Sequence, residues 1–523
     1  MQKKSFDNNY IYFFLLILIS SLVSFTYYFE QMALLNASYI AQLIEHPDQN
    51  NPFFLSLVNS PSIKFYFIAS MLKIGIPHEI ISRLILFLAT LFNATGIFLI
   101  SRYLTNSKSL SLLITFVLIF LRKNFGDIDY PTLMFTEHTN GMIALSLCSL
   151  IFGLITLRNL SFALFVNIIF ITIHPVMGLW MLMIISLSIL LNNFQKKNII
   201  QVNNLPYYLF IMAVILILYF YYVDHKSFPY DYNPIEYKIY FDYIEAHRTN
   251  YGNLKNLNWN YISKTLFLSF IILIYLFKAN GKKKFFLQTV LISIFLSIFL
   301  YFTYKYFSKI YPEIIIRTIP QRFFLTHSVI GYAIIISLVY KFLNIFFKKI
   351  NYDLSYNIIF TILLIHLLQH HNTFIERTSF LLKNKIYINN EEKIWSSVEK
   401  IGVPDGFGIT SNNLCNKVSL YLKKPLLICF ESLDYIPYFP ELAQPTRKIV
   451  EGVLNVEYKE IPNKHFGGIV DVDLKQIFQS KSKKDWTKIK EEFNVSFLIF
   501  PNNWNINLRS SSLGNKYKIY ILD

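Results

Sequence analysis

The sequence predicts an all-α polytopic membrane bundle of about 11 transmembrane helices, followed by a C-terminal soluble α/β domain. Hydrophobic residues make up 54% of the 523 residues and charged residues only 15%, a balance that soluble proteins do not show. Long apolar stretches recur as far as His371, and the composition becomes that of an ordinary soluble domain after that point. These observations exclude a disordered, fibrous or purely soluble chain.

The first apolar stretch runs from Tyr10 to Phe29 and follows Lys3 and Lys4. It is too long for the apolar core of a signal peptide, and no small-residue cleavage site follows it. The stretch is therefore predicted to be a retained first transmembrane helix.

A hydrocarbon core of about 30 Å requires about 20 apolar helical residues, or fewer in helices buried within a bundle. The predicted spans are 10–29, 79–101, 109–121, 139–157, 160–174, 176–193, 205–223, 261–277, 285–307, 323–347 and 354–371. The segment 61–76 is shorter and contains Lys64 and Lys73. It is predicted to be an amphipathic helix lying on the outer membrane surface.

The positive-inside rule sets the predicted orientation. With a cytoplasmic N-terminus, the lysine-rich turns at 278–284 and 341–349 fall in the cytoplasm, and most of the acidic residues fall outside. A membrane-spanning 61–76 segment would invert every later loop. We therefore expect a multi-pass inner (plasma) membrane protein whose C-terminal domain is extracytoplasmic.

The predicted domains are a membrane domain at 1–372, a linker at 373–390 and the α/β domain at 391–523. The outer loop and its surface helix lie within 30–78. In the last domain, alternating periodicities predict helices, strands and a loop-rich middle. The predicted helices are EEKIWSSVEKI and DWTKIKEEF, and the predicted strands are FGITS, PLLICFES, VSFLIFP and YKIYILD. An extracytoplasmic location would also permit a disulfide between Cys415 and Cys429.

Several functions lose support at this stage. The net charge of +17 is explained by topology, and no basic, aromatic-rich segment indicates nucleic-acid binding. The three cysteines form no zinc-binding pattern. No phosphate-binding loop, dinucleotide fingerprint, metalloprotease motif or nucleophile elbow occurs in a fitting context.

Ionisable residues gather in the predicted outer segments, where a lipid-linked substrate would need a base, cations for its phosphate and an apolar wall. Asp48 and Glu45 are the candidate catalytic bases. Arg317 and Arg322 are candidates for binding a phosphate, because a guanidinium grips its oxygens in a fork. The remaining candidate substrate-binding residues are Glu137, His138 and His174. A divalent cation is left open at Asp48 with Asp127 or Asp129; no cofactor is otherwise indicated.

Each of these residues also has a structural explanation. The acids suit solvated loops, polar turns or helix starts. The arginines suit interfacial anchors, and a histidine beside a proline at the edge of a span suits a hydrogen bond to a neighbouring helix.

The order of one span, an acidic outer loop with a surface helix, a bundle and an outer α/β domain resembles the GT-C superfamily of polyprenyl-phosphate-sugar-dependent membrane glycosyltransferases. The stretches HPDQNNPFF, EHTNGMIALSL and IHPVMGLW are similar to segments of bacterial multi-pass membrane proteins. The resemblance implies an inverting transfer, with an outer-loop carboxylate as base. The donor would be a polyprenyl-phosphate-linked sugar, and the acceptor a glycan, lipid or protein outside the cytoplasm.

Two alternatives remain beside an integral membrane glycosyltransferase-like protein. One is a transporter or flippase for a lipid-linked or anionic solute, which predicts ionisable groups near the bilayer midplane. The other is a non-catalytic envelope scaffold that presents the 391–523 domain.

Overall fold

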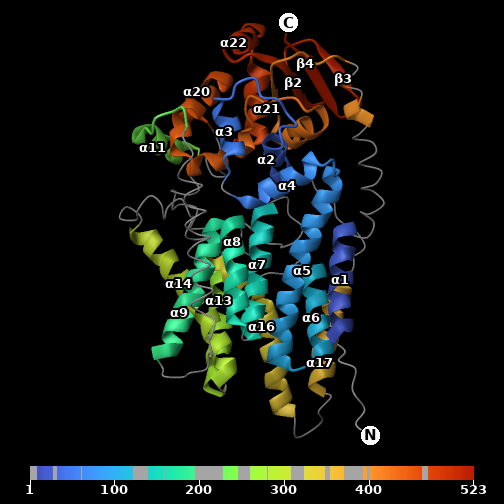
Figure 1. Ribbon diagram of the computed structural model, residues 1–523, viewed down its shortest axis with the longest axis vertical. Coiled ribbons are helices and arrows are strands. Elements are labelled where there is room, and N and C mark those ends of the chain that lie inside the picture. The colour runs from blue at the N-terminus through green and yellow to red at the C-terminus, as the bar shows by residue number, and fades with distance from the viewer. Residues whose placement is uncertain are drawn as a thin grey trace.

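The computed structural model describes fourteen stretches of the chain, and every structural statement below concerns these residues. They are 9–26, 32–60, 62–121, 139–157, 159–194, 228–244, 259–278, 281–307, 323–347, 354–369, 393–396, 398, 401–461 and 469–522. The described chain is mostly helical, with one small sheet near its C-terminal end. Figure 1 shows a long helical bundle closed at one end by a second body that holds the sheet. We call this body, the described residues between 393 and 522, the cap.

Every predicted span within the described chain is a helix, and the predicted span 205–223 lies outside it. The bundle helices are α1 (Asn9–Thr26), α5 (His78–Thr105), α6 (Lys108–Leu121), α7 (Thr139–Thr156), α8 (Leu160–Ile173), α9 (Pro175–Phe194), α13 (Trp259–Lys278), α14 (Gly281–Phe307), α16 (Leu325–Phe347) and α17 (Leu354–Gln369). Within the described residues, α5, α9, α14 and α16 are long and apolar enough to cross a membrane. The other apolar helices contain shorter apolar stretches, of 10–17 residues, which suit helices buried within a bundle. The described helices are therefore compatible with the predicted 11 spans, and four of them meet the length and composition of a span.

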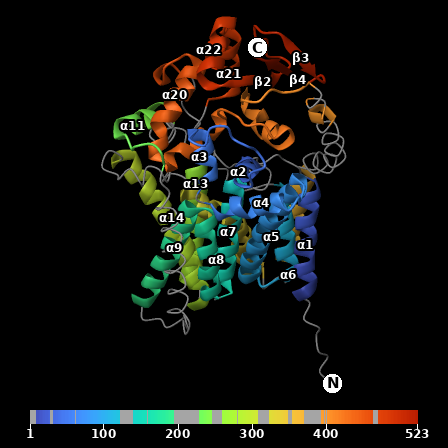
Figure 2. The same ribbon diagram turned by 45° about the horizontal axis from the view of Figure 1, so that its top comes forward.

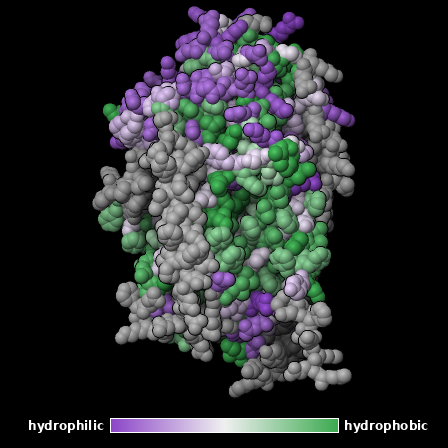
Figure 3. Space-filling model, viewed as in Figure 1, coloured by the Kyte–Doolittle hydropathy of each residue, from purple (hydrophilic) through white to green (hydrophobic). Residues whose placement is uncertain are grey.

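Small residues bring α5 and α7 into close contact. A Cβ atom at Gly96 would collide with the backbone of Ser149, and one at Gly153 would lie 2.9 Å from the Cα of Gly96. Close approach through small residues is typical of helices that pack in a membrane. On the face seen in Figure 3, the described surface of the bundle is largely apolar and that of the cap largely polar, as expected if lipid surrounds the first and water the second.

The segment predicted as a surface helix is α4 (Ile63–Lys73). It crosses the junction between the bundle and the cap (Figure 1). It ends in a turn at Gly75, whose φ of +84° is a left-handed conformation that glycine adopts at low cost. Its buried face is formed by Lys64, Phe65, Ile68, Ala69 and Leu72, so α4 packs into the protein along one side and carries a lysine there.

The cap contains a four-stranded sheet in the order β1-β2-β4-β3. Strand β1 (Phe407–Thr410) pairs in parallel with β2 (Val495–Pro501). Strands β4 (Tyr517–Ile521) and β3 (Ser510–Leu513) extend the sheet in antiparallel fashion. The helix before β2, α22 (Lys483–Phe493), begins at a capping box formed by Ser482 and Asp485, the arrangement that satisfies the first N–H groups of a helix.

The cap confirms the predicted strands FGITS, VSFLIFP and YKIYILD and the predicted helix DWTKIKEEF. The prediction of a strand at PLLICFES is wrong. This segment forms only a single parallel bridge, between Leu426 and Gly408, because the chain turns at Phe430 into the 3-10 helix η6 (Phe430–Tyr438). The predicted loop-rich middle is also wrong. It contains α20 (Ala443–Leu454) and α21 (Asp471–Ser480), and the buried residues of both helices share a hydrophobic core with residues of the sheet.

The disulfide that an extracytoplasmic location would permit is present between Cys415 and Cys429, whose Cα atoms are 6.0 Å apart. Cys415 belongs to the short helix α19 (Cys415–Lys417) that follows β1 and the 3-10 helix η4 (Asn412–Leu414). Cys429 directly precedes η6. The bond therefore ties the connection that leaves β1 to the segment that returns beside it.

Two loops from between the bundle helices dock onto the cap. The first carries α2 (Met32–Ile40) and α3 (Pro52–Val58), and the second carries α11 (Pro234–Tyr243). Tyr39 and Phe53 share a buried core with cap residues, and Tyr237, Tyr240 and Phe241 share another. Figure 2 shows α11 on one side of α20 and α3 on its other side. Both loops and the cap therefore lie at the same end of the bundle.

A charged clasp joins α11 to α20. The Arg447 guanidinium donates from Nη1 to both carboxylate oxygens of Glu236, at 3.2 and 3.1 Å, and from Nε to Glu451 Oε1 at 3.0 Å. These side chains are only 20–27% exposed. A charge-assisted network in such a partly buried place stabilises more than a fully exposed ion pair does.

We expect Arg447→Met to loosen the docking of α11 by about 1–3 kcal/mol, because two carboxylates lose their donors in a partly buried place. Limited proteolysis and thermal unfolding of the full-length protein would detect faster cleavage around α11 and a lower midpoint. Lys459→Met is the matched control, because its ion pair with Glu457 is well exposed. Equal effects of the two variants would contradict a specific role of the clasp.

Candidate functional site

Glu45 and Asp48 lie in the loop between α2 and α3, and both side chains are exposed. Asp48 Oδ1 accepts a hydrogen bond from the backbone N–H of Asn50 at 2.9 Å, a common way for an aspartate to fix a turn. The backbone carbonyl of Asn50 accepts in turn from the Tyr230 hydroxyl at 2.6 Å. The two candidate bases therefore sit on an ordered loop and face solvent.

The loop owes its order to His46, which is only 3% exposed. Its ring stacks on Phe54 at 4.7 Å and contacts Phe407 of the cap at 4.9 Å. His46 Nδ1 lies 2.6 Å from the carbonyl oxygen of Asp48, which can only accept, so Nδ1 carries the proton. Burial lowers the pKa of His46 to about 4, which keeps the ring neutral at pH 7. In the sequence His46 is only the first residue of the stretch HPDQNNPFF. Its buried position depends on Phe407, which lies on a strand in the cap.

Asn51 completes the docking of this loop. Its Oδ1 accepts from the N–H of Phe54 at 3.1 Å and so caps the start of α3, while its Nδ2 donates to the carbonyl of Leu427 in the cap at 3.2 Å. Asn is among the residues preferred at helix N-caps. One side chain thus begins a helix and fastens it to the cap.

His174 ends α8 where α9 begins at Pro175, as the sequence predicted for the junction of two spans. Its side chain is half-buried, and its Nδ1 accepts weakly from the N–H of Met177 at 3.4 Å. The neighbouring carbonyl of Ile173 accepts from the hydroxyl of Ser62 at 2.6 Å. This bond brings the start of α4 against the junction that holds His174.

Lys64, the second residue of α4, is the most unusual charge in the described chain. The residue is 7% exposed, and its ammonium has no hydrogen-bond partner in the described residues. Its nearest aromatic contact is the ring of Phe65, 4.4 Å from Nζ. Burial lowers the pKa of Lys64 to about 7. A buried ammonium without an anion is costly, and the sequence had marked Lys64 only as a reason to doubt a span.

The start of α4 is also an open helix N-terminus. Ser62 is the N-cap residue but makes no capping hydrogen bond, because its hydroxyl is bonded to Ile173 instead. The first N–H groups of a helix without such a cap attract anions. Lys64 is the second residue of this helix and is buried, and helical side chains lean towards the helix N-terminus. Ser62, Lys64 and His174 therefore form a candidate anion site at the junction of α4, α8 and α9.

The other predicted site residues lie outside the described residues, so their placement relative to this junction stays a prediction. They are Asp127, Asp129, Glu137, His138, Arg317 and Arg322. Within the described stretches, no group of three or more His, Cys, Asp or Glu side chains could hold a metal ion. Asp48 is accordingly not part of such a group there.

The sequence matches no protein-family model and no curated protein. The chain is similar in structure to the oligosaccharyltransferase of Archaeoglobus fulgidus, with a TM-score of 0.42 and 10% sequence identity. The similarity covers 94% of this chain and 69% of the archaeal one.

The pKa of Lys64 leads to a stability test. Its folded-state pKa of about 7 lies below the ordinary value of 10.5, so the unfolded chain binds more protons between these values and stability rises with pH there. The destabilisation is complete below pH 7 and is lost as pH rises towards 10.5. Lys64→Met should therefore raise the midpoint of thermal unfolding more at pH 6 than at pH 9, in the absence of added anions.

Lys73→Met is the control for this experiment, because Lys73 lies on the same helix and is exposed. It should leave the midpoint unchanged at both pH values. A Lys64→Met effect that is the same at pH 6 and pH 9 would show that the ammonium is not the source of the destabilisation.

Proposed function

We propose that the protein is an integral membrane glycosyltransferase-like enzyme that moves a sugar from a polyprenyl-phosphate carrier to an acceptor outside the cytoplasm. The observation that carries the proposal is the buried, unpartnered ammonium of Lys64 at the open start of α4. This site faces the junction of two apolar bundle helices. A phosphate on a lipid carrier supplies the anion that the site lacks and an apolar tail suited to the bundle.

The proposed reaction is a single displacement with inversion. The acceptor hydroxyl oxygen attacks the anomeric carbon, the bond from that carbon to the phosphate oxygen breaks, and polyprenyl phosphate leaves with the electron pair. A carboxylate takes the acceptor proton, a role we assign to Asp48 or Glu45. Both side chains are exposed, so bound substrate has to supply the shielding from water.

Lys64 acts on the leaving group in this proposal. Negative charge grows on the phosphate as the glycosidic bond breaks, and an ammonium already in place stabilises that charge without reorganisation. His174 lies next to the same helix start and is suited to donate a hydrogen bond to the phosphate. We assign Arg317 and Arg322 to the same phosphate. Glu137 and His138 are assigned to the wall of the cavity. A divalent cation at Asp48, Asp127 and Asp129 is a further, open proposal.

The proposed orientation places the cap and both docked loops outside the cytoplasm and the N-terminus inside. The disulfide between Cys415 and Cys429 supports it, because such bonds persist in oxidising compartments. The lysine-rich turns at the other ends of the bundle helices support it independently.

A transporter has weaker support. Among the described bundle residues, His327 is a fully buried ionisable side chain, and its Nδ1 lies 3.5 Å from the Ser297 hydroxyl. The neighbouring hydroxyls of Ser293 and Thr326 bond to each other at 2.7 Å. These side chains join α14 to α16, as interhelical hydrogen bonds do in membrane bundles.

The phosphate site predicts pH-dependent donor binding. Undecaprenyl phosphate should raise the thermal midpoint of the wild type in nanodiscs at pH 6, and the shift should shrink above pH 7 as free Lys64 loses its proton. Lys64→Met should remove most of the shift, whereas Lys73→Met should retain it. Equal stabilisation of wild type and Lys64→Met would remove Lys64 from the site.

The base assignment is tested by glycan transfer in membranes that contain Asp48→Asn or Glu45→Gln. Loss of the general base should lower turnover by about 10²–10⁴-fold with little change in donor binding. Unchanged turnover in both variants would rule out both carboxylates as the base.

The orientation is tested by thiol labelling. In the unfolded, unreduced protein a maleimide should add to Cys148 alone, which is the free cysteine of the described chain. After reduction, Cys415 and Cys429 should also react. Immediate labelling of all three without reductant would contradict an oxidising location of the cap.

A further inference from the structure

The parallel part of the cap sheet has an arrangement that the proposed function does not use. The chain leaves β1, returns beside it at Leu426, and then crosses over β1 to form β2 on the other side. The order across the sheet is therefore the Leu426 bridge, then β1, then β2. The chain leaves the carboxyl ends of β1 and β2 in different directions. Ligands of open α/β sheets bind in the crevice outside such ends.

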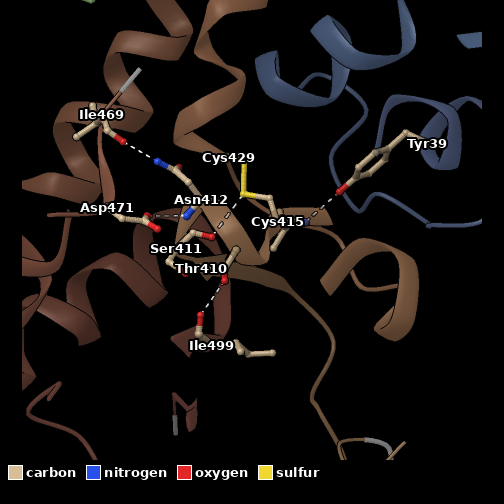
Figure 4. Close-up of a disulfide and its surroundings, with 10 residues drawn as sticks. Tyr39, Thr410, Ser411, Asn412, Cys415, Cys429, Ile469, Asp471 and Ile499 are labelled. Atoms are coloured by element: carbon tan, nitrogen blue, oxygen red, sulfur yellow. Dashed lines mark hydrogen bonds between the residues drawn. A yellow bond between two sulfur atoms is a disulfide. The ribbon is translucent and has the colours of Figure 1, made fainter. Parts of the chain in front are cut away.

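Polar groups collect at this end of β1. Ser411 directly follows the strand, is fully buried, and its hydroxyl has no partner in the described chain. The side-chain oxygen of Asn412 is likewise buried without a partner, while its Nδ2 donates to the carbonyl of Ile469 at 2.7 Å. Asp471 Oδ1 accepts from the backbone N–H of Asn412 at 2.8 Å. Figure 4 shows Ser411, Asn412 and Asp471 together beside the disulfide.

We propose that the carboxyl ends of β1 and β2 form a carbohydrate-binding site in the cap, with Ser411, Asn412 and Asp471 as its hydrogen-bonding side chains. The ligand class follows from the groups that are present. A buried hydroxyl, an amide oxygen and a carboxylate together accept more hydrogen bonds than they donate. A neutral ligand with several hydroxyl groups supplies the missing donors. Without such a ligand the buried Ser411 hydroxyl stays unpaired, which costs free energy.

Charge at the two ends of β1 supports a neutral, donor-rich ligand over an anion. Asp471 lies at the start of α21, where its negative carboxylate interacts favourably with the positive end of the helix dipole. Burial raises its pKa, as expected for a carboxylate partly withdrawn from water. Lys424, by contrast, pairs with Asp405 at 2.9 Å, and Asp405 precedes β1 at its opposite, amino end. No described lysine or arginine is bonded to Ser411, Asn412 or Asp471.

The disulfide makes this end of the sheet rigid. The Sγ atom of Cys415 lies 3.8 Å from the carbonyl oxygen of Ser411. Its disulfide partner, Cys429, lies at the end of the segment that returns beside β1. Thr410, the last residue of β1, donates to the Ile499 carbonyl of β2 at 2.7 Å. Polar groups fixed in this way bind with a smaller loss of conformational entropy.

The test uses the full-length protein in nanodiscs, free of sugar-based detergents, and saturation-transfer NMR with maltotriose, chitotriose and xylotriose at millimolar concentration. At least one of the three should receive saturation from the wild type. Ser411→Ala should weaken that binding about tenfold, the loss of one buried hydrogen bond. It should not weaken the fold, since the hydroxyl it removes has no partner in the free protein.

Asp471→Asn should weaken binding as well, and Asp405→Asn is the matched control at the other end of the strand. Thermal unfolding of each variant separates lost binding from lost folding. The proposal is overturned if none of the three sugars binds the wild type, or if Ser411→Ala and Asp405→Asn bind equally well. Binding is measured without a donor, so its result is independent of the proposed glycosyl transfer.

Discussion

Three buried tyrosine hydroxyls hold the loops between the bundle helices against the cap. Tyr39 accepts from the N–H of Leu426 at 3.1 Å, Tyr237 donates to the Pro437 carbonyl at 2.8 Å, and Tyr240 donates to the Leu433 carbonyl at 2.5 Å. Each ring also fills the core that it enters, so apolar burial and a satisfied polar tip act together. These contacts give the two loops a defined place on the cap.

The packing of α4 on the bundle explains why a buried lysine is tolerated. An ammonium without a partner would normally turn outward, since a lysine stem is long enough to reach water. Ser62 fixes the start of α4 on the α8–α9 junction, and α4 buries Phe65 and Ile68 beside Lys64. The helix cannot rotate Lys64 outward without exposing those side chains. The packing therefore maintains a costly charge, as expected where an anion is to be received.

Much of the fold follows from local sequence signals. Apolar stretches of the right length predicted the bundle helices, and dense β-branched and aromatic runs predicted β1, β2 and β4. Strand β3 was missed because its sequence, SSSL, is polar and its first residues are exposed; pairing with β4 alone makes it a strand. PLLICFES failed for the opposite reason, because an apolar run of that length fits any buried segment. Lys64 and His46 owe their burial to partners far along the chain, which periodicity does not report.

The first loop combines two kinds of chemistry that are positioned by different parts of the molecule. Asp48 is set by His46 and Asn51, both of which contact the cap, whereas Lys64 is set by the contact of Ser62 with the bundle. In the proposed reaction, the distance between a base at Asp48 and a phosphate at Lys64 would therefore depend on how the cap sits on the bundle. The tyrosines and the Arg447 clasp fix that relation, so under the proposed function residues remote from both groups would control whether acceptor and donor meet in reacting geometry.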